Sequence, residues 1–212
     1  GEDMRRVDVS EDDVAGDEEL RRRIARPKHI VTREVSGGKS YPDDLANAAL
    51  DLSRQRGGVT AVIANTVAVA ASVAAALRRR EKNVTCVLGR MRPYDRADAV
   101  NELRRLAESD GTGFIVGTQA LEVGLNYDCR SMVTEICPAP ALSQRLGRVN
   151  RFGRSDDGMV LVIDGGKFSE GPYDEADLDD ARKWLCDLGV SHPCGVSAFD
   201  LARVAMPDMR GR

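Results

Sequence analysis

The 212-residue sequence predicts an α/β domain built around a mostly parallel sheet, and two patterns lead to this fold class. Short apolar runs, such as residues 59–64, alternate along the chain with longer segments whose apolar residues recur at helical spacing, such as residues 43–56. Gly57 and Gly58 stand between these two and end the helix. Strands that alternate with helices form parallel β-α-β units with right-handed crossovers. A doubly wound sheet is therefore expected, and such sheets bind ligands at the carboxyl ends of their strands.

The expected strands are short, apolar runs that read as buried strands of a parallel sheet. They cover residues 29–35, 59–64, 84–88, 113–116, 132–136 and 159–163. The expected helices cover residues 43–56, 67–80, 94–107 and 176–188, together with a helix that begins near residue 141 and includes the arginine-rich stretch. Asn65 and Thr66 can cap the helix at 67–80. Pro138 and Pro140 delay the start of the arginine-rich helix.

The chain divides into three segments of different character. Residues 1–26 form an acidic lead-in or linker, residues 27–166 form the α/β lobe, and residues 167–212 form a C-terminal helical extension. The lead-in is rich in Asp and Glu and has little apolar periodicity. Because the sequence begins with Gly1 rather than Met, we expect it to be part of a longer protein.

Composition excludes several classes of protein. The formal net charge is −3, so any contact with nucleic acid must come from a local basic patch. No apolar run approaches the roughly 20 residues of a membrane helix, and no signal peptide precedes the first acidic residues. The five cysteines form no C-x-x-C pair, so reduced thiols and a cytoplasmic location are expected. Cys186, His192 and Cys194 are close in sequence but lack a fourth ligand for zinc.

The stretch 144–154 contains four arginines. On a helix, Gln144, Arg148 and Arg151 stand at i, i+4 and i+7 and share one side. The apolar residues of the same helix share the opposite side, and they are Leu142, Leu146 and Val149. Paired guanidinium groups match the oxygens of a polyphosphate. An exposed basic helix gives the same pattern, so this stretch alone does not decide between the two interpretations.

A second segment of interest follows the expected strand at 113–116. Its two glycines, Gly117 and Gly124, allow close approach of the backbone to a ligand. Thr118 offers a hydroxyl and a backbone N–H at the end of a strand, which suits a phosphate. Asn126 can bond a ribose hydroxyl or the arginine-bearing helix. Taken by itself, the segment also fits an ordinary strand-turn-helix corner.

Together the two segments resemble motifs V and VI of the superfamily 2 helicases. The matching residues are Thr118-x-x-x-Glu122-Val123-Gly124-Leu125 and Gln144-Arg145-x-Gly147-Arg148-x-x-Arg151. The extension Val149-Asn150-Arg151-Phe152-Gly153 is similar, more narrowly, to the helicase–nuclease of type I CRISPR systems. Asn65-Thr66 stands where that family's motif IV ends a strand, and residues 89–96 resemble its next motif. The resemblance covers about residues 28–165 and implies a RecA-like three-layer α/β/α lobe, the second of two.

The resemblance also implies roles at a nucleotide. Arg148 and Arg151 would be arginine fingers that reach the γ-phosphate of ATP. Gln144 would orient the nucleotide or the attacking water, and Gly124 and Asn126 would line the nucleotide side of the cleft. Many relatives carry Asp at the position of Asn126, so this sequence departs from the family pattern there. ATP and Mg²⁺ would be held mainly by the first lobe.

The resemblance implies a single strand of DNA as the second ligand. The residues that would face its phosphate backbone are Asn65, Thr66, Gly89, Arg90 and Thr118. Such contacts grip a strand without reading its sequence. The implied function is that of a motor lobe of an ATP-dependent DNA translocase or helicase in CRISPR interference. Its implied partners are the first lobe, a nuclease domain of the same protein and the CRISPR surveillance complex.

Several elements of a working motor or nuclease are absent from this sequence. The run Ser36-Gly37-Gly38-Lys39-Ser40 lacks the first glycine of a phosphate-binding loop, because Arg33 stands at that position. There is no acidic box for Mg²⁺, and neither His29 nor His192 precedes an Asp. The fragment alone is therefore expected neither to hydrolyse ATP nor to cut DNA.

Two alternatives stay open at this point. The lobe could belong to another superfamily 2 DNA or RNA helicase, or it could be a non-enzymatic RecA-like module that binds nucleic acid. A dinucleotide-binding domain is disfavoured, because no G-x-G-x-x-G opens the first β-α unit.

Overall fold

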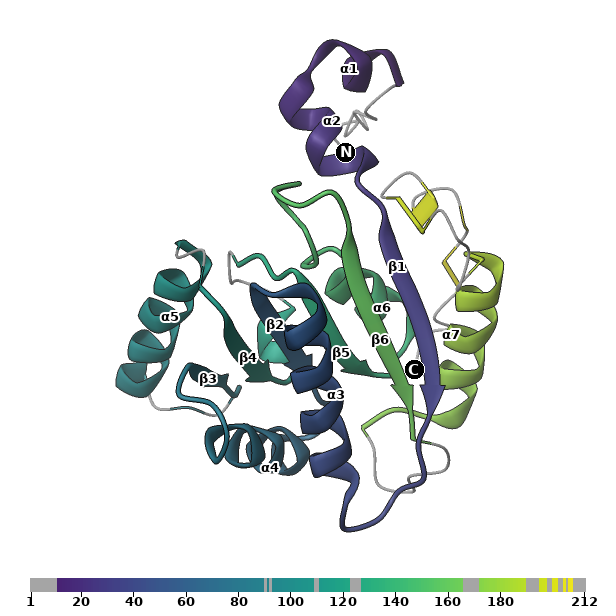
Figure 1. The fold of residues 1–212 in the computed structure, drawn as a ribbon. Coiled ribbons are helices and arrows are strands. Elements are labelled where there is room, and N and C mark those ends of the chain that lie inside the picture. The colour runs from purple at the N-terminus through teal and green to yellow at the C-terminus, as the bar shows by residue number, and fades with distance from the viewer. Residues whose placement is uncertain are drawn as a thin grey trace, which may run out of the picture.

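The computed structural model describes residues 11–89, 91, 93–108, 111–122, 127–165, 172–189, 195–197, 200–201, 204 and 206–207. Within them, six strands form one sheet in which every neighbouring pair is parallel (Figure 1). The order across the sheet is β1-β6-β5-β2-β4-β3. The strands are β1 Lys28–Glu34, β2 Val59–Ile63, β3 Val84–Val87, β4 Gly113–Gly117, β5 Ser131–Glu135 and β6 Gly158–Asp164. The predicted fold class and all six predicted strands are confirmed.

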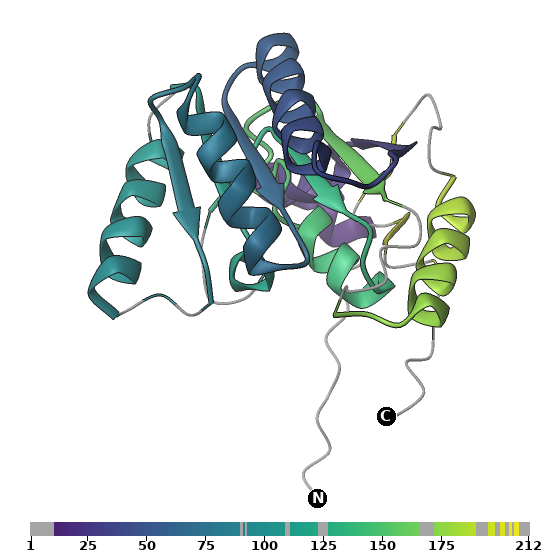
Figure 2. The same cartoon turned by 90° about the horizontal axis from the view of Figure 1, so that it is seen from below.

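The helices lie in two layers on either side of the sheet (Figure 2). One layer contains α3 Tyr41–Arg56 and α4 Val67–Arg78, and the other contains α5 Pro93–Glu108, α6 Ala139–Leu146 and α7 Glu175–Asp187. The alternation of side chains along β2 divides the core. Val62 packs with the α3 and α4 layer, whereas Ala61 and Ile63 pack with the other layer. The result is a three-layer α/β/α domain with two apolar cores.

Local signals set most of the helix boundaries. The side chain of Thr66 accepts a hydrogen bond from the backbone N of Val69 at 3.2 Å, so Thr66 caps α4 as predicted. Gly57 ends α3 with φ 64°, a left-handed conformation that favours glycine. Pro140 stands in the first turn of α6, where a missing backbone N–H costs no helical hydrogen bond.

The arginine-rich helix is shorter than predicted. It ends at Leu146, and Arg148 and Arg151 lie in the turn that follows. The chain leaves the helix because the backbone around Val149 pairs with Cys129: the N of Cys129 donates to the O of Arg148 at 3.1 Å. Leu142, Leu146 and Val149 are nevertheless all buried, as the apolar pattern predicted. The expectation that Gln144, Arg148 and Arg151 share one helical face is wrong.

The two terminal segments contact the sheet differently. Helices α1 Glu11–Gly16 and α2 Glu18–Ala25 lie beyond the amino ends of the strands, at the top of Figure 1. Near the other terminus, Val196 pairs antiparallel with Lys28 through two backbone hydrogen bonds of 2.8 Å. The proposed limits of the three segments stay predictions. In the part of the chain that the structure describes, no helix has the length and apolar character needed to span a bilayer.

We expect Gly117→Ala to destabilise the domain, because Gly117 ends β4 against its neighbours. A Cβ there would overlap the carbonyl oxygen of Val87 and lie 2.8 Å from side-chain carbons of Leu121. Overpacking of this kind costs about 1–3 kcal/mol, which urea denaturation measures. Gly89→Ala is the matched control, because a Cβ at Gly89 meets no atom within 4 Å. Equal stability of the two variants would contradict the packing argument.

Candidate functional site

A buried arginine, Arg145 on α6, forms the centre of the site. Its side chain has no exposed surface, and its Nε donates to the carboxylate of Glu122 at 2.8 Å. Its Nη1 donates to the hydroxyl of Thr134 at 2.8 Å and to the carbonyl oxygen of Glu135 at 3.1 Å. Both terminal nitrogens also lie 3.2 Å from Oδ1 of Asn65. Arg145 therefore joins the ends of β2 and β5 to the segment that follows β4.

Arg145 was not among the site residues expected from the sequence. A pattern that indicates its burial is present, however, because Arg145 stands at i+3 from Leu142 and i−4 from Val149. These positions place a charged side chain within the apolar stripe of a helix. A charge in such a stripe requires a buried partner, and Glu122 is that partner.

The two predicted arginine fingers lie just beyond α6. Arg148 is half-buried, its guanidinium carbon lies 5.8 Å from the ring centre of Tyr127, and its Nη2 donates to the carbonyl oxygen of Glu122. Burial lowers the pKa of Arg148, and the charge of Arg151 lowers it further. Arg151 is exposed. The guanidinium groups of Arg148 and Arg151 thus lie near each other. Arg148 is held by a hydrogen bond to Glu122, and Arg151 is open to solvent.

The turn that carries Arg151 is fixed by polar groups beneath it. Asp128 accepts hydrogen bonds from the backbone N of Arg151 at 2.8 Å and of Phe152 at 3.4 Å. Burial raises the pKa of Asp128, although these two N–H groups act in the opposite direction. The side chain of Asn150, which has φ 47°, exchanges hydrogen bonds with the backbone of Ser155 at 2.7 and 3.1 Å. The backbone of the turn is therefore held while the Arg151 side chain stays accessible.

The turn that carries Arg148 and Arg151, the arginine turn, lies at the amino end of the sheet. A ligand was expected at the opposite, carboxyl end. Its bridge partner Cys129 stands just before β5 begins at Ser131. Arg148 and Arg151 consequently lie near the amino ends of the strands, rather than at the carboxyl ends. The reason is topological, because α6 starts where β5 ends and runs back along the sheet before the turn begins.

The residues predicted to contact a nucleic acid do follow the carboxyl ends of strands. Asn65 and Thr66 follow β2, Gly89 follows β3, and Thr118 follows β4. The side chain of Asn65 is held internally, because its Nδ2 donates to the carbonyl oxygen of Ile136 at 2.7 Å while its Oδ1 binds Arg145. Gly89 is exposed, whereas Thr118 is buried. The carboxyl edge thus offers mainly backbone groups.

Several predicted site residues receive no structural description. Arg90, Gly124 and Asn126 lie outside the described residues, as do His192 and Cys194. Gln144 is described and is exposed on α6. Among the described residues, no group of three or more His, Cys, Asp or Glu side chains could hold a metal ion.

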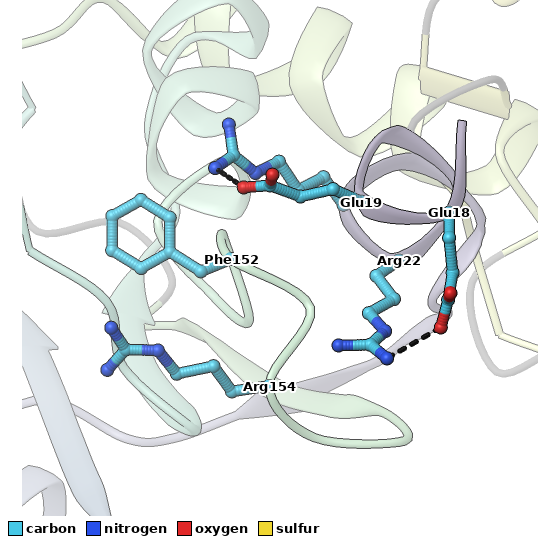
Figure 3. A pocket seen from close by; sticks show the side chains of 6 residues that line it. Glu18, Glu19, Arg22, Phe152 and Arg154 are labelled. Atoms are coloured by element: carbon cyan, nitrogen blue, oxygen red, sulfur yellow. Dashed lines mark hydrogen bonds and ion pairs between the residues drawn. The ribbon is translucent and has the colours of Figure 1, made fainter.

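Helix α2 packs directly against the arginine turn (Figure 3). Gly153 has φ 61°, and a Cβ there would overlap the carbonyl oxygen of Arg22. The guanidinium carbon of Arg23 lies 5.8 Å from the ring centre of Phe152. Just after α2, Arg26 forms an ion pair of 2.8 Å with Asp156. This contact could not be expected from the sequence, because about 130 residues separate the two segments.

Comparison with known proteins finds similarity to Cas3 proteins. Residues 56–154 match the family model described as CRISPR-associated nuclease/helicase Cas3, C-terminal. The CRISPR-associated helicase Cas3 of Thermoproteus tenax is 32% identical over 130 residues, which are 61% of this chain and 22% of that protein. A Cas3 relative from Myxococcus xanthus is 34% identical over 108 residues, which are 14% of its length. The chain therefore spans about a fifth or less of these relatives.

Solved structures agree on the fold. The crystal structure of T. fusca Cas3-AMPPNP matches 81% of this chain with a TM-score of 0.60 at 16% identity, over 22% of that chain. A CRISPR RNA-guided surveillance complex, pre-nicking, contains a chain that matches 84% of this one with a TM-score of 0.62 at 16% identity, over 25% of its length. The C-terminal domain of the DEAD-box protein Dbp5 matches 77% of this chain with a TM-score of 0.57 at 18% identity, over 88% of its length.

Fold and sequence similarity lead in the same direction. The RecA-like α/β/α architecture of this chain is shared with T. fusca Cas3 and with the C-terminal domain of Dbp5. Within that architecture, the region from residue 56 to residue 154 is similar to the C-terminal part of CRISPR-associated nuclease/helicase Cas3.

We expect Arg145→Met to destabilise the lobe by about 3–5 kcal/mol, because it leaves the Glu122 carboxylate buried without its partner. Adding Glu122→Leu removes the orphaned charge and restores most of the loss. Urea denaturation of the two variants measures both effects. Arg105→Met is the control, since Arg105 pairs with Glu102 on the exposed face of α5 and its loss changes little. A double variant no more stable than the single one would contradict this account.

Proposed function

We propose that this chain is the C-terminal motor lobe of an ATP-dependent single-stranded DNA translocase or helicase that acts in CRISPR interference. The observation that carries the proposal is the turn after α6. In this turn the Arg148 side chain donates a hydrogen bond to the carbonyl oxygen of Glu122, and Arg151 is open to solvent. The two side chains are near enough to each other for the charge of Arg151 to lower the pKa of Arg148. Two clustered guanidinium groups on a fixed backbone suit the terminal phosphates of a nucleotide.

In this proposal Arg148 and Arg151 stabilise charge that develops on the γ-phosphate. Arginine fingers contribute about 10³ to 10⁵ in rate to phosphoryl transfer. Preorganisation favours such a role, because Asp128 and Glu122 already fix the backbone and side-chain positions of the turn. Gln144, Gly124 and Asn126 are assigned to the same nucleotide face. T. fusca Cas3 has been crystallised with ATP, which supports a nucleotide as the ligand here.

Another lobe of the whole protein would hold most of the nucleotide and its Mg²⁺. The described residues of this chain contain no cluster of metal-binding side chains. The chain also spans only 22% and 14% of the two curated relatives. We therefore propose that the fragment is inactive alone. Its partners would be the first RecA-like lobe, a nuclease domain and a CRISPR surveillance complex, in the cytoplasm.

Single-stranded DNA is proposed to lie along the carboxyl edge of the sheet. The assigned residues there are Asn65, Thr66, Gly89, Arg90 and Thr118. Since the Asn65 side chain binds Arg145 and Ile136 internally, we assign its part in DNA contact to the backbone around it. The nucleotide and DNA sites then lie at opposite ends of the strands, and closure of two lobes around ATP would move one relative to the other.

The shared fold leaves two alternative functions open. The Dbp5 C-terminal domain has the same lobe architecture, so another superfamily 2 DNA or RNA helicase, or a non-enzymatic RecA-like module, would present the same scaffold. The Cas3-like match over residues 56–154 favours the CRISPR-associated assignment. Comparing ATP turnover of the intact protein with single-stranded DNA and with RNA separates these functions.

We expect Arg148→Ala in the intact protein to reduce ATP turnover by about 10³-fold or more, because a charge that stabilises the transition state is lost. Affinity for single-stranded DNA should stay the same, because Arg148 lies at the other end of the sheet from the proposed DNA edge. Steady-state phosphate release and fluorescence anisotropy measure the two quantities. Arg105→Ala, an exposed arginine on α5, is the matched control. Unchanged turnover in Arg148→Ala would refute the arginine-finger role.

A further inference from the structure

The side chain of Arg151, which the proposed function assigns to the γ-phosphate, is exposed. Within the part of the chain that the structure describes, its guanidinium forms no hydrogen bond or ion pair. The guanidinium carbon lies 6.0 Å from the ring centre of Phe152, the next residue. An exposed arginine side chain can otherwise adopt many rotamers, and each rotamer places the charge differently. The contact with Phe152 is therefore what limits the position of this charge.

Three guanidinium groups gather at the ring of Phe152. The guanidinium carbons of Arg23, Arg151 and Arg154 lie 5.8, 6.0 and 5.3 Å from the ring centre. Each distance is within the range of about 6 Å over which the face of an aromatic ring attracts a cation. Because like charges repel one another, such a cluster depends on attraction to the ring that its members share. The ring is only partly buried, so packing in the core does not account for it.

The backbone on both sides of the ring is fixed. The N of Phe152 donates to the Asp128 carboxylate at 3.4 Å, and the N of Arg151 donates to the same carboxylate at 2.8 Å. Gly153 has φ 61°, and a Cβ there would overlap the carbonyl oxygen of Arg22 on α2. Since side chains occupy a few staggered rotamers, a fixed backbone leaves the ring few positions.

Helix α2 contacts the ring through one long side chain. In Figure 3 the ring of Phe152 extends away from α2, on which Arg22 and Glu18 lie. The guanidinium of Arg23 nevertheless lies over the ring, while an ion pair with Glu19 ties the same group to α2. Arg22 pairs with Glu18 in the same way, at 2.6 Å. The ring contact therefore distinguishes Arg23 from its neighbour on the helix.

We propose that Phe152 is a positioning residue whose aromatic face holds the Arg151 guanidinium in the orientation that meets the γ-phosphate, and that Arg23 of α2 supports the ring. The inference rests on the proposed function and adds to it the residue that orients one of its two arginines. Phe152 acts through Arg151 and does not itself touch the nucleotide. A charge that is already in place loses no freedom as the transition state forms. Helix α2, which comes from the acidic lead-in, thereby becomes part of the site.

The test measures steady-state ATP turnover of the intact protein with Phe152→Leu, which keeps an apolar side chain and removes the aromatic face. The kcat is expected to fall about fivefold, because a cation–π contact at a partly exposed site is worth about that factor. The KM for ATP is expected to stay within about twofold of the wild-type value, since Phe152 does not touch the nucleotide. Phe152→Tyr keeps the ring and should retain the wild-type kcat within about twofold.

The same change in an Arg151→Ala background separates positioning from a general effect on the turn. If the ring acts through Arg151, Phe152→Leu causes no further loss of kcat once this guanidinium is absent. Arg23→Ala is expected to lower kcat in the same direction as Phe152→Leu. Arg22→Ala is the matched control, because it breaks an equivalent ion pair on α2 and should leave kcat unchanged.

Three results would overturn the role of Phe152. They are an unchanged kcat in Phe152→Leu, an equal loss of kcat in Phe152→Tyr, and a loss that persists in full in the Arg151→Ala background. Equal effects of Arg23→Ala and Arg22→Ala would overturn the part assigned to α2. Failure of the proposed function itself would appear separately, as full turnover in Arg151→Ala.

Discussion

The ion pair between Arg145 and Glu122 fixes the carboxyl and amino ends of the sheet relative to each other. Arg145 has no exposed surface, yet its guanidinium contacts Asn65, Thr134 and Glu135 as well as Glu122. Buried charges are tolerated only when their hydrogen bonds are satisfied, so each partner constrains the others. Glu122 also accepts a hydrogen bond from Arg148 through its carbonyl oxygen. Hydrogen bonds therefore connect the carboxyl ends of the strands, through Arg145 and Glu122, to Arg148 near the amino ends.

This arrangement separates the two surfaces to which the proposed function assigns different ligands. The carboxyl edge of the sheet presents strand ends and loops, whereas the amino end presents the arginine turn and α2. Helix α6 and the segment after β4 run between the two edges, and Arg145 and Glu122 lie where they meet. Because the connection is made by packed, satisfied groups, the lobe is expected to move largely as a rigid body. Under the proposed function, movement would then occur between this lobe and its partner lobe rather than within this one.

The sequence was most informative where local chemistry decides structure. The Thr66 cap, the glycine at the end of α3 and the apolar runs of the six strands could all be read from the sequence. The end of α6 could not be read from the sequence, because it depends on pairing between Val149 and Cys129, which are 20 residues apart. Contacts of α2 with Phe152 are more distant still. The assigned roles of Arg148 and Arg151 stay predictions, although their turn now has a defined geometry.

The pairing of Val196 with Lys28 has a consequence for solubility. Strand β1 is the outermost strand of the sheet on its side, and an open strand edge invites other chains to add to it. The segment around Val196 covers the start of this edge, where Lys28 and Ile30 are buried. Further along, the exposed charges of Arg33 and Glu34 discourage intermolecular pairing. Proteolytic loss of the tail would expose the backbone N–H and C=O groups of Lys28 at the start of this edge and promote edge-to-edge aggregation.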